Sequence, residues 1–111
     1  MDAPGRIYQT VTLSGTDPSA AVDCSRYQLV GLYTPGTITS TAITFTASND
    51  GSTYVAVRDV AGASAYSATV AASYYVPLDP RVFAGAQWVK LVPGSSEASA
   101  RSVTCVLRPV S

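Results

Sequence analysis

Apolar and polar residues alternate over short stretches of the sequence, which is the pattern of β-strands with one buried face. In residues 6–13, for example, Ile7, Val11 and Leu13 share one face. Turn-forming residues separate such stretches every 8 to 15 positions, and no amphipathic helical pattern occurs between them. About eight strands are expected, at residues 6–13, 26–34, 37–48, 53–60, 67–70, 74–78, 87–93 and 101–110.

Three local signals are stronger than the rest. Residues 49–52, Asn-Asp-Gly-Ser, tolerate the left-handed conformations of a tight turn, so they predict a β-hairpin. Asp79, Pro80 and Gly85 supply an N-cap acid, a first-turn proline and a terminating glycine, which predict one helical turn. The apolar residues of 37–48 do not stay on one face of a regular strand, so a bulge or strand boundary is expected near residues 40–42.

The stretch at residues 26–34 is apolar on both faces. A regular strand there places Tyr27, Leu29 and Tyr33 on one side and Val30 and Leu32 on the other. Since both sides carry apolar residues, this strand is expected to be central in its sheet.

Many short strands in a chain of 111 residues predict an all-β protein. The expected architecture is an antiparallel β-sandwich with the topology of a jelly roll. Residues 6–111 are expected to form one domain, because no linker divides them. Residues 1–5 lack a packing pattern, so they are expected to be a flexible N-terminal arm.

The composition limits the partners. Seven basic and seven acidic residues give a formal net charge of zero, so no nucleic acid is expected as a partner. No segment has the apolar length of a membrane span, and the N-terminus lacks a signal-peptide pattern, so synthesis in the cytoplasm and no membrane contact are expected. Only 13% of residues are charged, whereas Ser, Thr, Ala and Val make up about half of the chain. Such a surface must be covered by hydroxyls, small apolar groups or a partner.

The sequence contains no histidine, which removes the usual base of hydrolytic triads and the commonest zinc ligand. The carboxylates lie in separate loops, and Asn49-Asp50 fits a turn better than a calcium site. We therefore expect no enzymatic activity, no cofactor and no metal. Cys24 and Cys105 are expected to be free, buried thiols, with a disulfide as the alternative if their strands are neighbours.

Several residues are candidates for a protein interface. If Val89 and Leu91 face the core, Trp88 must point outward, under a neighbouring loop or another chain. Exposed aromatic side chains and the N-terminal arm are the other features of this kind. The candidate interface residues are Asp2, Arg6, Tyr8, Tyr74, Trp88 and Lys90.

Three segments together resemble small jelly-roll virion proteins of tailed phages and prophages. Residues 21–35 match an opening strand, and residues 44–57 match an extended strand followed by a "DG-x-x-Y" hairpin. Residues 76–99 match a block with "F-x-G" and "aromatic-V-K/R-L" motifs and a Ser-rich loop. The resemblance covers residues 21–107 and implies a capsid decoration (cement) or head-fibre protein.

A decoration protein of this kind binds the major capsid protein at the outer surface of the virion and bridges neighbouring capsomers. A homotrimer is the simplest assembly, because several weak footprints then act together. The alternatives are a carbohydrate-binding module, as in host adsorption by a head fibre, and a tail or neck component. Carbohydrate-binding sandwiches share the hairpin and strand motifs at Asp50, Gly51, Tyr54, Trp88, Val89, Lys90 and Leu91.

Overall fold

The structure is a computed structural model that describes residues 6–109, so the expected arm at residues 1–5 lies outside the described residues. Residues 6–109 form nine strands and one short 3-10 helix. The first strands are β1 (Ile7–Gly15), β2 (Val22–Asp23), β3 (Tyr27–Tyr33), β4 (Ala42–Ser48) and β5 (Val55–Ala56). The remaining elements are β6 (Ser67–Thr69), β7 (Tyr75–Pro77), η1 (Pro80–Phe83), β8 (Trp88–Pro93) and β9 (Glu97–Pro109).

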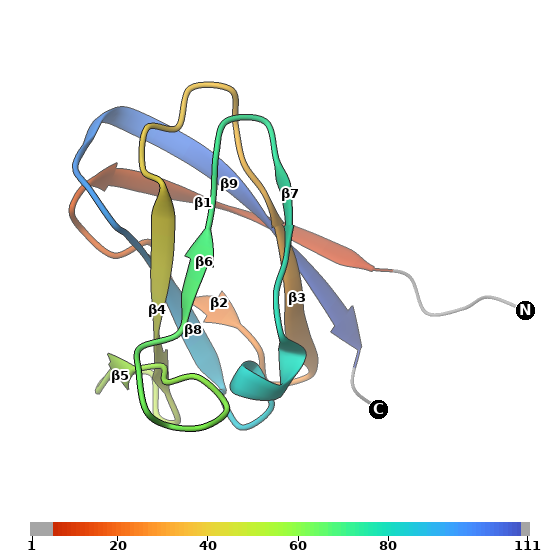
Figure 1. The fold of residues 1–111 in the computed structure, drawn as a ribbon. Helices are drawn as coiled ribbons and strands as arrows, with labels where there is room; N and C mark the ends of the chain where they lie inside the picture. The colour runs from red at the N-terminus through yellow and green to blue at the C-terminus, as the bar shows by residue number, and fades with distance from the viewer. Residues whose placement is uncertain (1–5, 110–111) are drawn as a thin grey trace, which may run out of the picture.

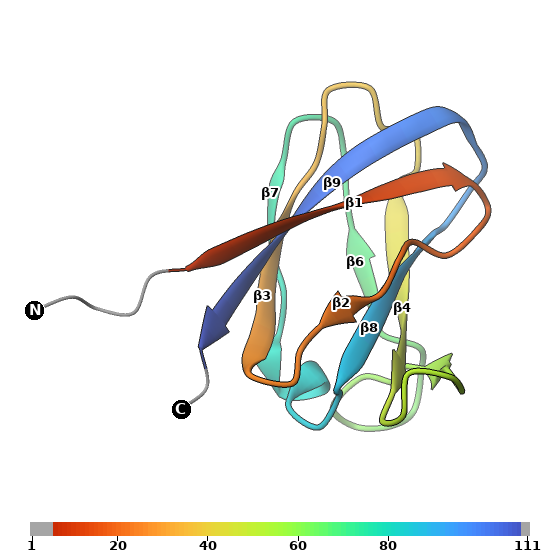
Figure 2. The same cartoon turned by 180° about the vertical axis from the view of Figure 1, so that it is seen from behind.

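The described strands pack as two antiparallel sheets, so the predicted β-sandwich is confirmed (Figures 1 and 2). One sheet has the order β1-β9-β3-β7 and the other the order β2-β8-β4-β5, with β6 also paired to β4. We call these the β9 sheet and the β8 sheet. Strand β1 pairs with β9, β2 with β8, β3 with β7, and β4 with β5 and β6. This nested pairing of the two halves of the chain is the topology of a jelly roll.

Strands β5 and β6 together take the place of one strand of the β8 sheet. Strand β5 pairs with residues 46–47 of β4, and β6 pairs with residues 42–44. The expected short strand at residues 67–70 is therefore confirmed as β6, within an otherwise irregular segment. Short edge strands of this kind limit further pairing on that side of the sheet.

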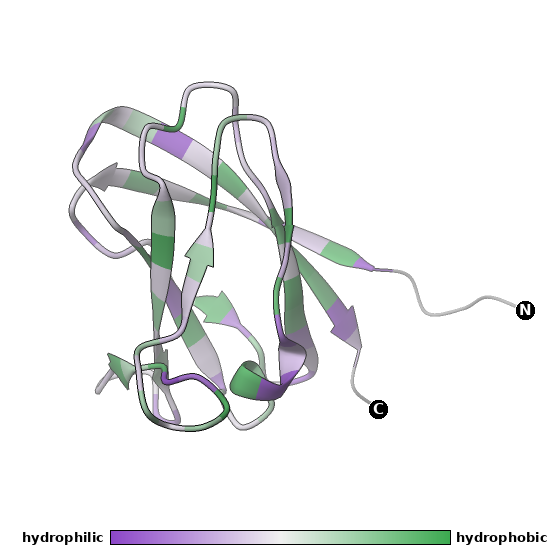
Figure 3. Ribbon diagram, viewed as in Figure 1, coloured by the Kyte–Doolittle hydropathy of each residue, from purple (hydrophilic) through white to green (hydrophobic). Residues whose placement is uncertain are grey.

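The core lies between the inner faces of the two sheets. It includes Phe45 and Leu91 from the β8 sheet, Leu13 and Leu107 from the β9 sheet, and Phe83 from η1, all almost fully buried. The rings of Phe45 and Phe83 meet edge to face, with centroids 5.1 Å apart. Figure 3 shows apolar and near-neutral bands alternating along β4, which is the two-residue period predicted from the sequence.

The predicted turns are confirmed. The hairpin between β4 and β5 turns at residues 49–52, where Gly51 has a φ of 79° that favours glycine. The side chain of Asp79 accepts a hydrogen bond from the Arg81 N–H and begins η1. No helix within residues 6–109 is long and apolar enough to cross a membrane.

The side-chain orientations predicted for residues 26–34 are wrong after Leu29. The register of β3 against β9 shifts between Leu29 and Gly31, which marks a β-bulge at Val30. Leu29 and Leu32 therefore both face the core, and Tyr33 points to solvent. The interruption expected near residues 40–42 is confirmed as a strand boundary, because β4 begins at Ala42.

Cys24 and Cys105 are free and buried, as predicted. Burial raises the pKa of Cys24 to about 11 and that of Cys105 to about 12. Both thiols are therefore protonated near neutral pH, and they pack as small apolar groups.

One buried carboxylate links the start of β9 to the segment between β3 and β4. Glu97, at the start of β9, accepts hydrogen bonds from the backbone N–H and hydroxyl groups of Thr39 and Ser40, at 2.6 to 3.2 Å. The Nε of Arg101 lies 3.1 Å from the same carboxylate. Burial by itself would raise the pKa of Glu97, but the hydrogen bonds from Ser40 and Thr39 outweigh it and lower the pKa to about 2.

We predict that Glu97→Gln lowers the free energy of unfolding by about 3 kcal/mol, because an amide cannot accept all of these hydrogen bonds. Urea unfolding at neutral pH measures the change. Asp59→Asn is the matched control, since Asp59 is only partly buried and its carboxylate accepts one backbone hydrogen bond, from Ala63. The control is expected to change stability by less than about 0.5 kcal/mol.

The same carboxylate makes stability depend on pH. Its folded pKa of about 2 lies below the ordinary value of 4.5, so its contribution is present above pH 4.5 and is lost as the pH falls toward 2. Glu97→Gln should reduce this acid-dependent loss. An equal loss of stability in variant and wild type over this range would contradict the role given to Glu97.

Candidate functional site

The six candidate interface residues do not form one site. Trp88 and Lys90 lie on the outer face of the β8 sheet, whereas Tyr8 lies on the outer face of the β9 sheet, on the opposite side of the sandwich. Arg6 is exposed just before β1, and Tyr74 is exposed just before β7. Asp2 lies outside the described residues.

Three exposed tyrosines gather on the outer face of the β9 sheet. Tyr8, Tyr33 and Tyr75 are 60%, 48% and 48% exposed. They come from β1, β3 and β7, and the β9 residues between them are Thr104, opposite Tyr33, and Val106, opposite Tyr8. We call Tyr8, Tyr33 and Tyr75, with Thr104 and Val106, the tyrosine surface.

Local packing fixes two rings of the tyrosine surface, those of Tyr33 and Tyr75. The ring centroids of Tyr33 and Tyr75 are 4.8 Å apart. Tyr75 lies directly over Gly31, and a Cβ at this glycine would come within 2.5 Å of the Tyr75 hydroxyl. Val106 also points outward in β9, yet it is only 3% exposed, so neighbouring side chains cover it. The surface is therefore an ordered layer of side chains on a sheet.

Little charge lies on this face. Strands β1, β3 and β7 contain no charged residue. Arg108 follows Val106 at the next outward position of β9 and donates a hydrogen bond to Gln28 Oε1 at 3.1 Å. An aromatic surface rich in hydroxyls and poor in charge has the composition of the centre of a protein interface.

The outer face of the β8 sheet carries a second aromatic group. Trp88 is half-buried there, so its predicted outward orientation is confirmed. The hairpin turn lies on the indole, since a Cβ at Gly51 would be 3.7 Å from the ring. The Nζ of Lys90 lies 4.4 Å from the ring centroid of Tyr54. A loop of the same chain therefore covers part of Trp88, and an interface at this position stays a prediction.

The hairpin turn over Trp88 is itself well ordered by hydrogen bonds. Asp50 Oδ1 accepts hydrogen bonds from the backbone N–H groups of Ser52 and Thr53 and from the hydroxyl of Ser48. The bonds from Thr53 and Ser52 lower the pKa of Asp50 below its usual value. This carboxylate thus stabilises the turn that the sequence predicts at residues 49–52.

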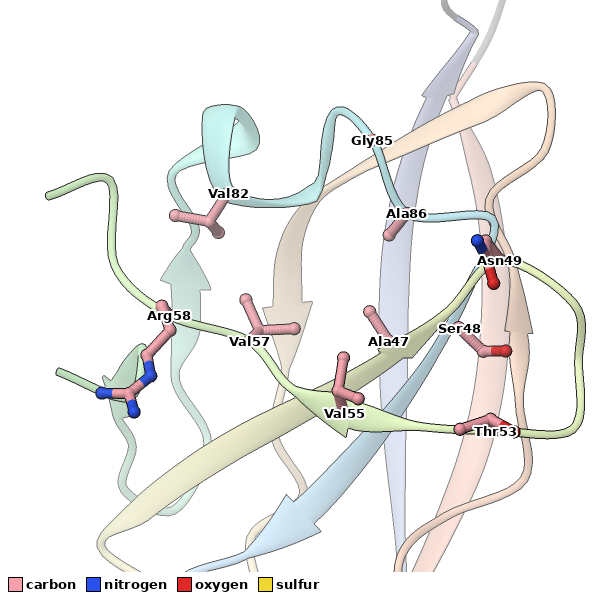
Figure 4. A pocket seen from close by; sticks show the side chains of 10 residues that line it. All are labelled: Ala47, Ser48, Asn49, Thr53, Val55, Val57, Arg58, Val82, Gly85 and Ala86. Atoms are coloured by element: carbon pink, nitrogen blue, oxygen red, sulfur yellow. The ribbon is translucent and has the colours of Figure 1, made fainter. Parts of the chain in front are cut away.

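A groove of about 500 Å³ lies between the β4–β5 hairpin and η1 (Figure 4). Its walls are formed by Ala47, Val55 and Val57 on one side and by Val82 and Ala86 on the other. Val55 pairs with Ala47 and shares its inner face of the β8 sheet. It is nevertheless 64% exposed, because the sandwich is open at this end. The lining contains no carboxylate, thiol or imidazole, so the groove can hold an apolar group but offers no acid, base or thiol nucleophile.

No group of three or more His, Cys, Asp or Glu side chains that could hold a metal occurs within residues 6–109. The expectations of no catalytic, cofactor or metal site are not tested further by the geometry and stay predictions.

The fold and surface define a jelly-roll β-sandwich with an aromatic outer face. No model of a known protein family matches the sequence, and no curated protein sequence matches it. Among solved structures, the chain is similar to the SPBc2 prophage-derived protein YomS. The TM-score is 0.64 and the sequence identity is 16%, with 97% of each chain covered. At this identity the likeness shows a shared fold over 97% of each chain.

Tyr33 and Tyr75 are not among the candidate interface residues predicted from the sequence. A regular strand over residues 26–34 places Tyr33 on the same side as the buried Leu29. A glycine inside a strand pattern indicates a bulge or a close approach, and Gly31 shows both. That signal was present in the sequence, but it does not identify Tyr75 as the ring that Gly31 accommodates.

We predict that Gly31→Ala lowers the free energy of unfolding by about 2 kcal/mol, because the new Cβ displaces the Tyr75 ring. In a Tyr75→Ala background the same substitution should cost much less, since the obstructing atoms are gone. Urea unfolding of the two single variants and the double variant measures this coupling. Equal costs of Gly31→Ala in both backgrounds would show that the ring does not rest on Gly31.

Proposed function

We propose that this chain is a non-enzymatic structural protein of a phage virion, and specifically a decoration protein on the outer surface of the capsid. Two observations support a phage virion protein: the sequence resemblance over residues 21–107, and the fold shared with a prophage-derived protein. Its partner in this proposal is the major capsid protein.

The tyrosine surface carries the proposal of attachment. Tyrosine is enriched among the residues that dominate binding at protein interfaces, because its ring buries a large area at little cost in conformational entropy. The rings of Tyr33 and Tyr75 pack on each other, and Tyr75 also packs on Gly31, so these two rings gain little order on binding. A surface with few charges also needs little desolvation of ions.

The proposed mechanism is mechanical. Each copy binds across neighbouring capsomers, and shell expansion then has to break the added contacts as well as those within the shell. A single small footprint binds weakly, so the proposal includes self-association, which holds several footprints together. No chemical step, cofactor or metal is part of this function, in line with a chain that contains no histidine.

Carbohydrate binding is the second candidate function, and the same surface favours it. The exposed rings of Tyr33 and Tyr75 offer flat apolar faces to sugar rings, and neighbouring threonine hydroxyls offer hydrogen bonds. The groove next to η1 is a less suitable site, because its lining contains no aromatic ring.

We predict that Tyr33→Ala weakens binding to emptied capsids of the encoding phage by about 2 kcal/mol or more, because it removes a central ring of the surface. Tyr74→Ala is the matched control. Tyr74 is also exposed, but alternation along the strand places it on the side of the buried Val76, opposite to Tyr75. Co-sedimentation with capsids measures the affinity of each variant.

The outcome separates the two functions. Loss of capsid binding in Tyr33→Ala but not in Tyr74→Ala supports decoration through the tyrosine surface. Absence of capsid binding by the wild-type protein, together with binding on a glycan array that Tyr33→Ala abolishes, would replace decoration with carbohydrate binding. Equal capsid binding by both variants would remove the tyrosine surface from the attachment.

A further inference from the structure

Strand β1 is a long sheet edge with an open side. It pairs with β9 from Ile7 to Leu13 without a register shift, and no described strand pairs with its other side along this stretch. The next backbone hydrogen bond of β1 outside β9 is at Ser14, whose carbonyl accepts from the Asp17 N–H. Within the stretch, the side chain of Gln9 donates a hydrogen bond to the Ala21 carbonyl at 3.5 Å. Within residues 6–109, the backbone groups of residues 7–13 that do not point toward β9 have no backbone hydrogen-bond partner.

The other edges formed by residues 6–109 are much shorter. Strand β7 has three residues and ends at Pro77, β2 and β5 have two residues each, and β6 has three. Proteins commonly prevent unwanted strand pairing by such short edges, by prolines and bulges, and by charged side chains. These edges conform to that rule.

Between Ile7 and Leu13, the edge of β1 has none of these features. Its nine residues include no charge and no proline, and its only irregularity comes after Leu13. Ile7 has the parity of the core residues Val11 and Leu13, but it remains 39% exposed. A long, uncharged and unprotected edge is a template for another strand.

We propose that β1 pairs antiparallel with β1 of a second copy of this chain, about a two-fold axis at Thr10. The two β9 sheets then form one continuous sheet with the order β7-β3-β9-β1 and its symmetry mate. An antiparallel contact of a strand with itself is self-complementary, so both copies use the same residues. Thr10 of one copy lies opposite Thr10 of the other, and Ile7 lies opposite Leu13.

Charge at the ends of the edge favours a second copy as the occupant. Arg6 precedes β1 and Asp17 closes the edge at Ser14, and both side chains are exposed. Antiparallel pairing centred on Thr10 brings Arg6 of each copy to the Asp17 end of the other. Two opposite-charge pairs result, while the strand between them contributes no repulsion and the chain has no net charge.

The pairing also extends the tyrosine surface. Residues of equal parity pair in this register, so Tyr8, Thr10 and Thr12 of both copies stay on the same outer face. The two tyrosine surfaces then become one surface on a single sheet. Association ends at two copies, because the far edge of each sheet is the short strand β7. This contact makes a dimer in place of the trimer expected from the sequence.

The inference rests on the self-association in the proposed function but needs no capsid, so purified full-length chain tests it alone. Light scattering after gel filtration should give twice the 11.5 kDa mass of the chain at high micromolar concentration. Thr10→Lys places two like charges on the axis and should weaken the dimer at least about tenfold. Thr69→Lys, at an exposed position of the edge strand β6, is the control and should leave the dimer unchanged.

A charge exchange tests the register. Arg6→Glu should weaken the dimer, and Asp17→Arg added to it should restore the dimer. Unchanged thermal melting of Thr10→Lys measured under dilute conditions shows that the fold is intact. A monomer or a trimer in the wild type, a dimer insensitive to Thr10→Lys, or no rescue by the double exchange would overturn the proposal. Capsid binding by a strictly monomeric protein would leave the proposed attachment in place and remove only the β1 pairing.

Discussion

The fold depends on the insertion of the last strand between the first and the third. Strand β9 is the interior strand that joins β1 to β3, and its inward residues Val103, Cys105 and Leu107 are almost fully buried. Until β9 is in place, β1 has no hydrogen-bonded neighbour and the β9 sheet consists of β3 and β7 alone. The core therefore cannot close before residues 97–109 are in place. Glu97 fixes the start of this strand to the β3–β4 connection.

The same winding explains the surfaces. The jelly roll begins with an edge strand, so the long strand β1 is open on one side. The other sheet edges are formed by short strands. Because β9 and β3 lie between β1 and β7, tyrosines far apart in the sequence reach one outer face. The bulge at Val30 turns Tyr33 outward, and Gly31 makes room for Tyr75. The tyrosine surface and the open edge of β1 adjoin, because Tyr8 belongs to both.

Much of the fold could be predicted from the sequence, because its signals are local. The hairpin at residues 49–52, the helical turn after Asp79 and the outward orientation of Trp88 each follow from a few neighbouring residues. The predicted side-chain orientations in β3 are wrong after Leu29, because a bulge changes which residues face the core. The tyrosine surface could not be predicted, because it requires the order of β1, β9, β3 and β7 in the sheet, and an alternating pattern contains no information on strand order.

The central claim is that the chain attaches to a capsid through the outer face of the β9 sheet. Hydrogen exchange of the free and the capsid-bound protein tests it most directly, because each strand reports its own protection. The account predicts added protection in β3 and β7 on binding to capsids, with β8 and the hairpin over Trp88 unchanged. Added protection confined to the hairpin and β8 would contradict it, since attachment would then occur on the opposite face of the sandwich.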